Sequence, residues 1–183
     1  IPNCFDKVLD IDLCHLQRDP SNAIRTETKR FCLEHGYTFH NAREHAGLMR
    51  NMIIRTSSTG EIMVIVVFNA DDRERIAALL EHLAERFPKI TSLFYVVNTK
   101  WNDSTGDLTP VCFKGKDHIV ERMEDLQFKV GPKSFYQTNS EQAYELYKVT
   151  RDFADLTCRE VLYDLYTGTG TIANFCARRA AKV

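Results

Sequence analysis

The run MVIVVF, residues 63–68, constrains the fold of this 183-residue chain most, because it is apolar without interruption. A strand that is apolar on both faces has to be covered on both sides, so the run predicts a central strand of a sheet. The turn residues Ser58-Thr59-Gly60 precede it, and the strand-like segment 48–57 precedes the turn. Segments 48–57 and 61–69 therefore predict a β-hairpin.

Two helices are predicted around this hairpin, at 21–35 and 71–87, from their apolar stripes and their ends. Gly36 follows the first, and Asp71 with Glu74 forms a capping-box pattern at the start of the second. Strands are predicted at 92–98 and within 117–130, and a short one at 6–14. Residues 1–125 thus predict a two-layer α+β domain with a mixed or antiparallel sheet, in the order β-α-β-β-α-β.

Residues 126–183 have a different organisation and predict the start of a second, Rossmann-like domain. A polar-aromatic loop, SFYQTN (134–139), leads into a predicted helix at 141–153. A predicted strand at 161–165 then ends in a glycine-rich turn at 167–171, and a helix opens at about Thr171. Such a turn brings backbone N–H groups close to a ligand. The residues GTGTIA fit the dinucleotide pattern formally, but Asp164 with D-L-Y-x-G-x-G is typical of S-adenosylmethionine (SAM) dependent methyltransferases.

Composition excludes several other classes. Lys plus Arg is 24 and Asp plus Glu is 25, so no uniform basic coat for nucleic acid exists, although a local basic face is compatible. No apolar run is long enough to span a membrane, no secretory signal pattern is present, and a cytoplasmic protein is expected. None of the six cysteines has CxxC spacing, which favours reduced thiols. The spacing of His35, His40 and His45 matches no standard zinc pattern.

Three stretches together resemble the RNA uracil-5-methyltransferases, of the bacterial 23S rRNA type that carries an iron–sulfur cluster. They are FKVGPKSFYQTNSEQAYELY (128–147), VLYDLYTGTGTI (161–172) and GLMRNMIIRTSSTGEIMVIVV (47–67). The segment DKVLDIDLCHLQ near the start extends the match over nearly the whole chain. Because the chain begins without Met and stops within a helical pattern, we expect a fragment, with a TRAM domain upstream and the rest of the catalytic domain downstream.

The resemblance implies a role for individual residues. Gln137 would contact SAM, and Tyr166 would line the same pocket. Thr167, Gly168 and Gly170 would wrap the methionine part of the cofactor, and Thr171 stands where many members of the family have Asn. Asp164 would organise the turn. Cys14 resembles the last ligand of the [4Fe–4S] cluster, and since one cysteine cannot hold such a cluster, a bare thiol is expected in this fragment.

The resemblance also implies the partner and the chemistry of the complete protein. The partner would be RNA, and the match at Cys14 implies 23S rRNA. A cysteine thiolate adds to carbon 6 of uracil, carbon 5 then takes the methyl group from SAM, and a base removes the proton at carbon 5. The motifs that carry the nucleophile and the base are absent from this sequence, and Cys112, Cys158 and Cys176 do not match them. We expect no catalytic residue in the fragment, no methyl transfer by it, and weak SAM binding or none.

Two alternatives remain open at the level of sequence. A nicotinamide or flavin oxidoreductase would use GTGTIA and requires an acidic residue after its second strand. A non-enzymatic RNA-binding module would hold RNA without SAM. Neither the target uracil nor the oligomeric state follows from the sequence.

Overall fold

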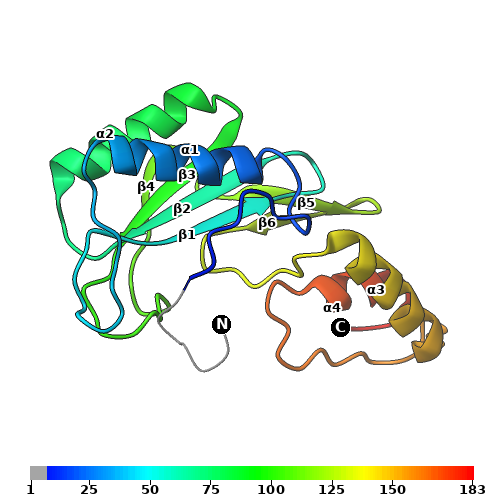
Figure 1. Ribbon diagram of the computed structural model, residues 1–183. Helices are drawn as coiled ribbons and strands as arrows, with labels where there is room; N and C mark the ends of the chain where they lie inside the picture. Colours follow the sequence, from blue (N-terminus) through cyan, green and yellow to red (C-terminus); the bar gives the residue numbers. More distant parts are fainter. Residues whose placement is uncertain (1–7) are drawn as a thin grey trace. The chain divides into compact units, whose positions relative to one another are not determined.

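The computed structural model describes residues 8–183, which form two compact units (Figure 1). The first unit comprises the described residues up to Thr56 together with Ile62–Asp117. The second comprises the turn Ser57–Glu61 and His118–Val183. The predicted domains 1–125 and 126–183 concern the complete protein, and that boundary stays a prediction. No helix in the described part of the chain is long and apolar enough to cross a membrane.

A four-stranded mixed sheet in the order β1-β2-β3-β4 forms the centre of the first unit. Its strands are β1 (Met49–Thr56), β2 (Ile62–Phe68), β3 (Ile90–Val97) and β4 (Val111–Gly115). β1 and β2 pair antiparallel as the predicted hairpin, β2 and β3 pair parallel, and β4 pairs antiparallel with β3. Every residue of β2 is buried, so its prediction as a central strand is confirmed.

Helices α1 (Ser21–Glu34) and α2 (Arg73–Arg86) form the second layer on one face of this sheet (Figure 1). The core between the layers includes Ile24 and Phe31 of α1, and Leu79 and Leu83 of α2. The alternate residues of β2 from Ile62 to Phe68 face these side chains. The predicted two-layer architecture with a mixed sheet is therefore confirmed.

The predicted details of the first unit were wrong in three places. Residues 8–14 form no strand, and the rest of the predicted strand at 6–14 lies outside the described residues. The cap of α2 is Asp72, whose carboxyl group accepts a hydrogen bond from the Arg75 amide at 3.1 Å, rather than Asp71. The edge strand β4 was not predicted, because its side chains are mostly exposed and only its pairing with β3 defines it.

The second unit contains a β-hairpin and two helices. Strands β5 (Ile119–Met123) and β6 (Leu126–Val130) pair antiparallel, and α3 (Ser140–Ala154), α4 (Thr171–Cys176) and a 3₁₀ turn (Ala177–Arg179) follow. Their apolar core joins Met123, Phe128, Tyr147 and Phe175. The strand predicted at 161–165 was wrong: only Val161 makes an isolated bridge, with Lys182. A parallel strand forms only when neighbouring strands hydrogen-bond to it. Residues 162–165 pair with no strand in the described part of the chain.

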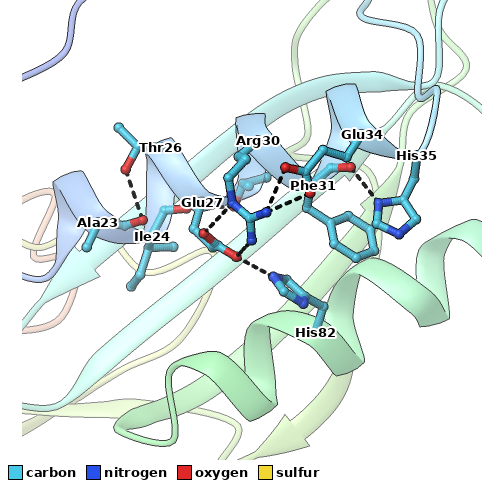
Figure 2. A network of polar contacts seen from close by, with 10 residues as sticks. Ala23, Ile24, Thr26, Glu27, Arg30, Phe31, Glu34, His35 and His82 are labelled. Carbon is cyan, nitrogen blue, oxygen red and sulfur yellow. Dashed lines mark hydrogen bonds and ion pairs between the residues drawn. The ribbon is translucent and has the colours of Figure 1, made fainter.

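A polar cluster joins α1 to α2 on the helical layer (Figure 2). Glu27 accepts hydrogen bonds from Arg30 Nη2 at 2.5 Å and Nε at 3.0 Å, and its Oε1 lies 2.6 Å from His82 Nε2. The ring of Phe31 stacks between those of His35 and His82. The Arg30 hydrogen bond and, after it, the contact with His82 lower the pKa of Glu27 from 4.5 to about 2.

We expect Glu27 to stabilise the fold in a pH-dependent way. Its folded pKa is depressed, so its contribution is complete above about pH 4.5 and is lost as the pH falls toward 2. The difference in unfolding free energy between wild type and Glu27→Gln should shrink over that window, measured by urea unfolding at pH 7 and pH 3. Glu85→Gln, at an exposed position of α2, is the control. An equal difference at pH 7 and at pH 3 would contradict the assignment.

Candidate cofactor site

The glycine turn is held together by Asp164. Oδ2 of this side chain accepts a hydrogen bond from Thr167 Oγ1 and one from the Ala173 amide, both at 3.0 Å. The first bond closes the turn, and the second satisfies an amide in the first turn of α4, which would otherwise have no partner within the helix. The expectation that Asp164 organises the turn is in keeping with these two contacts.

Three residues of the turn adopt a left-handed backbone at every second position: Tyr166 (φ 62°), Gly168 (φ 57°) and Gly170 (φ 72°). The two glycines tolerate this conformation without strain. A Cβ added at Gly168 would meet no atom within 4 Å, whereas one at Gly170 would lie 3.0 Å from Asn174 Nδ2. Gly168 therefore leaves its side of the turn open to a ligand, and Gly170 makes room for the start of α4.

The turn is also joined to the SFYQTN loop. Thr169 Oγ1 lies 3.5 Å from the Phe135 carbonyl oxygen, to which it donates, and 2.8 Å from Thr171 Oγ1. These contacts bring the two predicted cofactor motifs together, although Thr169 and Phe135 are 34 positions apart in the sequence. Thr171 is buried, so its hydroxyl faces Thr169 rather than solvent.

The predicted cofactor residues fall into two groups by exposure. Gln137, Thr167, Gly168 and the fully exposed Tyr166 lie at the surface, while Gly170 is half-buried and Thr171 is buried. The exposed hydroxyl, amide and aromatic groups, with the open face at Gly168, fit the methionine end of SAM chemically.

The remaining candidates have other surroundings. Cys14 is half-buried, and its backbone is held by Asn22, with bonds of 2.8 Å and 3.1 Å. No group of three His, Cys, Asp or Glu side chains among residues 8–183 could hold a metal ion, so the described residues do not fit a [4Fe–4S] cluster. Cys176 is buried, and burial raises the pKa of its thiol, which makes it a poor nucleophile.

Arg50, which lies in the hairpin segment that resembles the family, has a structural role. It occupies the bulge between Met49 and Asn51, and its side chain is only 2% exposed. The guanidinium donates to the carbonyl oxygens of Asn98, Lys100 and Asn102 at 2.7, 2.6 and 2.9 Å. The bulge turns this side chain inward, which strict strand alternation does not predict.

The sequence did not single out Glu121, which is 4% exposed and joins three segments of the second unit. It accepts hydrogen bonds from the Ser58 amide at 3.0 Å, from Ser58 Oγ at 2.6 Å and from Ser140 Oγ at 3.2 Å. Ser140 is the first residue of α3, directly after the SFYQTN loop. The sequence contained a signal for its burial, because strand alternation places Glu121 on the same side of β5 as the apolar residues Ile119 and Met123.

A glycine-rich turn that opens a helix is part of the cofactor-binding arrangement of doubly wound α/β enzymes. No family model matches the chain. It is 58% identical to an uncharacterized RNA methyltransferase of Bacteroides thetaiotaomicron and 55% identical to one of Porphyromonas gingivalis, over 100% of this chain and 41% and 40% of those proteins. The chain is thus similar over its whole length to these RNA methyltransferases, and it spans about two fifths of their length.

A solved structure of an RNA methyltransferase is also similar to the chain. The tRNA (uracil-54, C5)-methyltransferase of Pyrococcus abyssi, crystallised with S-adenosyl-L-homocysteine, matches with a TM-score of 0.74 at 28% identity. The match covers 95% of this chain and 42% of that one. The oxidoreductase alternative is not favoured by these relatives, and neither is a module without enzymatic activity.

Proposed function

We propose that the complete protein transfers a methyl group from SAM to carbon 5 of a uracil in RNA. The observation that carries the proposal is the contact between the glycine turn and the SFYQTN loop, through Thr169 and Phe135. It joins the two motifs that resemble the cofactor site of RNA uracil-5-methyltransferases. The similarity to a tRNA uracil-5-methyltransferase bound to S-adenosyl-L-homocysteine, the demethylated form of SAM, adds support.

In this proposal SAM supplies the electrophilic methyl group, and the residues of this chain bind and orient it. Gln137 donates to the cofactor, and the backbone of Thr167 to Gly170 surrounds its methionine part. Tyr166 presents its ring to the same ligand. Its left-handed backbone is unfavourable for a tyrosine, and such strain is found disproportionately at functional sites.

The proposed RNA is 23S rRNA, on the resemblance of Cys14 to a cluster ligand, and the cytoplasm is the location that this substrate implies. A tRNA substrate, as the name of the Pyrococcus protein gives for that enzyme, is the competing outcome. Cys14 would be a cluster ligand only together with cysteines outside residues 8–183. A full-length Cys14→Ser variant that loses bound iron would support this assignment, and one that keeps it would refute it.

Methyl transfer to carbon 5 expels the hydrogen of that carbon, which provides a specific assay. RNA transcribed with uridine tritiated at carbon 5 should release tritium to water when it is incubated with the full-length protein and SAM. A 23S rRNA transcript and a tRNA transcript are compared in parallel. Methyl incorporation without tritium release would place the methyl group elsewhere, and no incorporation into either RNA would overturn the proposal.

Asp164 should be a positioning residue for SAM. Replacing it by alanine removes the acceptor for Thr167 and Ala173, and hydrogen bonds to a charged acceptor contribute about 1.5–3 kcal/mol each. In the full-length protein, Asp164→Ala should raise the KM for SAM about tenfold or more and leave the KM for RNA unchanged. Asp164→Asn, which retains one acceptor oxygen, should show a smaller effect. Equal changes in both constants would indicate general loss of structure instead.

A further inference from the structure

Trp101 is the single tryptophan of the chain, and its side chain is 80% exposed. It lies in the loop between β3 and β4, at the polar sequence WNDSTGD. Tryptophan has a large apolar side chain that is highly buried on average, so a tryptophan exposed to this extent is unusual. Neither the fold of the first unit nor the proposed cofactor site uses it.

One face of the Trp101 ring is covered by another ring. The centroid of the His45 imidazole lies 4.2 Å from that of Trp101, with 24° between the planes, so the two rings stack. His45 is positioned by its own loop, in which its carbonyl oxygen accepts from Asn69 Nδ2 at 3.3 Å. Since the side chain is nevertheless 80% exposed, the opposite face of the indole is open to solvent.

The loop that carries Trp101 is fixed before any ligand arrives. The carbonyl groups of Lys100 and Asn102, on either side of the tryptophan, both accept from the buried guanidinium of Arg50. Asn98 adds two bonds, from its Nδ2 to the Asn102 carbonyl and from the Lys100 amide to its Oδ1, each 3.1 Å. A rigid aromatic ring loses little conformational entropy on binding, which favours affinity.

The charges beside the ring argue against a phosphate site. The ammonium group of Lys100 is paired with Asp107, and the guanidinium of Arg50 is paired with Asp103 at 3.1 Å. Both cations next to Trp101 are therefore compensated by carboxylates. The ligand that suits an open indole face of this kind is flat, aromatic and uncharged, and unpaired nucleobases are bound on such rings.

We propose that Trp101, backed by His45, is a stacking site for an unpaired base of the RNA substrate. The inference rests on the proposed function, in that it takes the partner of the chain to be RNA. Stacking reads no sequence, so the site would hold the RNA strand in place rather than select the target uracil. Each base stacked on an aromatic side chain contributes enough for an affinity change of about tenfold or more on removal of the ring.

The tryptophan is its own reporter, because no other residue of the chain contributes indole fluorescence. The 183-residue chain is titrated with a short single-stranded oligouridylate, and an abasic oligonucleotide of the same length serves as the control. We expect quenching of the Trp101 emission by the oligouridylate alone. No quenching, or equal quenching by the abasic strand, would overturn the inference.

Variants separate stacking from loss of structure. With a dye-labelled oligouridylate followed by fluorescence anisotropy, Trp101→Ala should weaken binding about tenfold, and Trp101→Phe should restore most of it. Phe153→Ala, which removes an aromatic ring that is 87% exposed on α3, is the matched control and should bind as wild type does. Equal affinity of Trp101→Ala and wild type would refute the stacking site, as would equal losses in Trp101→Ala and Phe153→Ala.

The inference and the proposed function fail in different ways. If the full-length protein releases tritium from uridine-labelled RNA and Trp101→Ala binds RNA normally, the proposed methyl transfer is supported and the stacking site is refuted. If no methyl group is transferred but oligouridylate quenches the Trp101 emission, the stacking site is supported and the proposed reaction is refuted.

Discussion

Replacing Arg50 by alanine is expected to lower the unfolding free energy of the first unit by about 3 kcal/mol, because three carbonyl groups lose a charged donor and hydrogen bonds to charged groups contribute about 1.5–3 kcal/mol each. The guanidinium is almost inaccessible and donates to three backbone carbonyl groups of the loop after β3. Without it these carbonyl groups lose their donor, whereas the exposed carboxylate of Asp103 remains hydrated. Each polar group left unsatisfied out of water costs about 1–3 kcal/mol.

Urea unfolding followed by Trp101 fluorescence measures this effect directly, since the tryptophan lies in the loop that Arg50 holds. Arg50→Lys should recover little, because an ammonium group cannot reach three carbonyl groups that are arranged for a planar fork. Arg73→Ala, at an arginine whose side chain is 88% exposed, is the matched control and should change stability by less than about 0.5 kcal/mol. A similar stability for Arg50→Ala and Arg73→Ala would contradict the assigned role.

Replacing Glu121 by alanine is expected to destabilise the second unit by about 3 kcal/mol. The side chain accepts from the amide and the hydroxyl of Ser58 and from the hydroxyl of Ser140. Its removal leaves these donors unsatisfied and opens a cavity beside the core of the unit. Glu121→Gln keeps the shape and one acceptor oxygen, so its cost should be smaller.

Hydrogen exchange gives the local readout for Glu121. The amides of Val120 and Arg122 donate to Glu61 Oε2 and Ser58 Oγ, in the segment that Glu121 holds. Their protection should fall strongly in Glu121→Ala, while the amides of β2 in the first unit keep theirs. Glu85→Ala, at an exposed position, should leave both sets unchanged. Protection of Val120 and Arg122 as in wild type would refute the role of Glu121.

The elements that followed from sequence are those with a strong local signal. The apolar run of β2, the Ser58-Thr59-Gly60 turn and the stripes of α1 and α2 each indicate their structure within a short window. The glycine turn was found in the same way, and α4 begins at Thr171 as predicted. The sequence contains the SFYQTN and glycine-turn motifs in recognisable form, but it does not show that the two motifs are in contact.

The errors have a common physical origin in pairing between distant segments. β4 is a strand through its hydrogen bonds to β3, and the segment 161–165 is not one because only Val161 finds a partner, in Lys182. At Arg50 a bulge interrupts the alternation of side chains along β1 and turns the guanidinium into the protein. Side-chain period and residue type do not report such contacts.

By itself the sequence determined the order of most helices and strands, the central strand and the motifs that point to SAM and RNA, because these depend on residues close together in the chain. The tertiary structure alone decided which motifs meet and which charges are buried. Long-range packing produced three of these features: the hydrogen bonds of Asp164 at the glycine turn, the contact of Glu121 with Ser58, and the stacking of Trp101 on His45. In each case burial sets the energy of the polar or aromatic group.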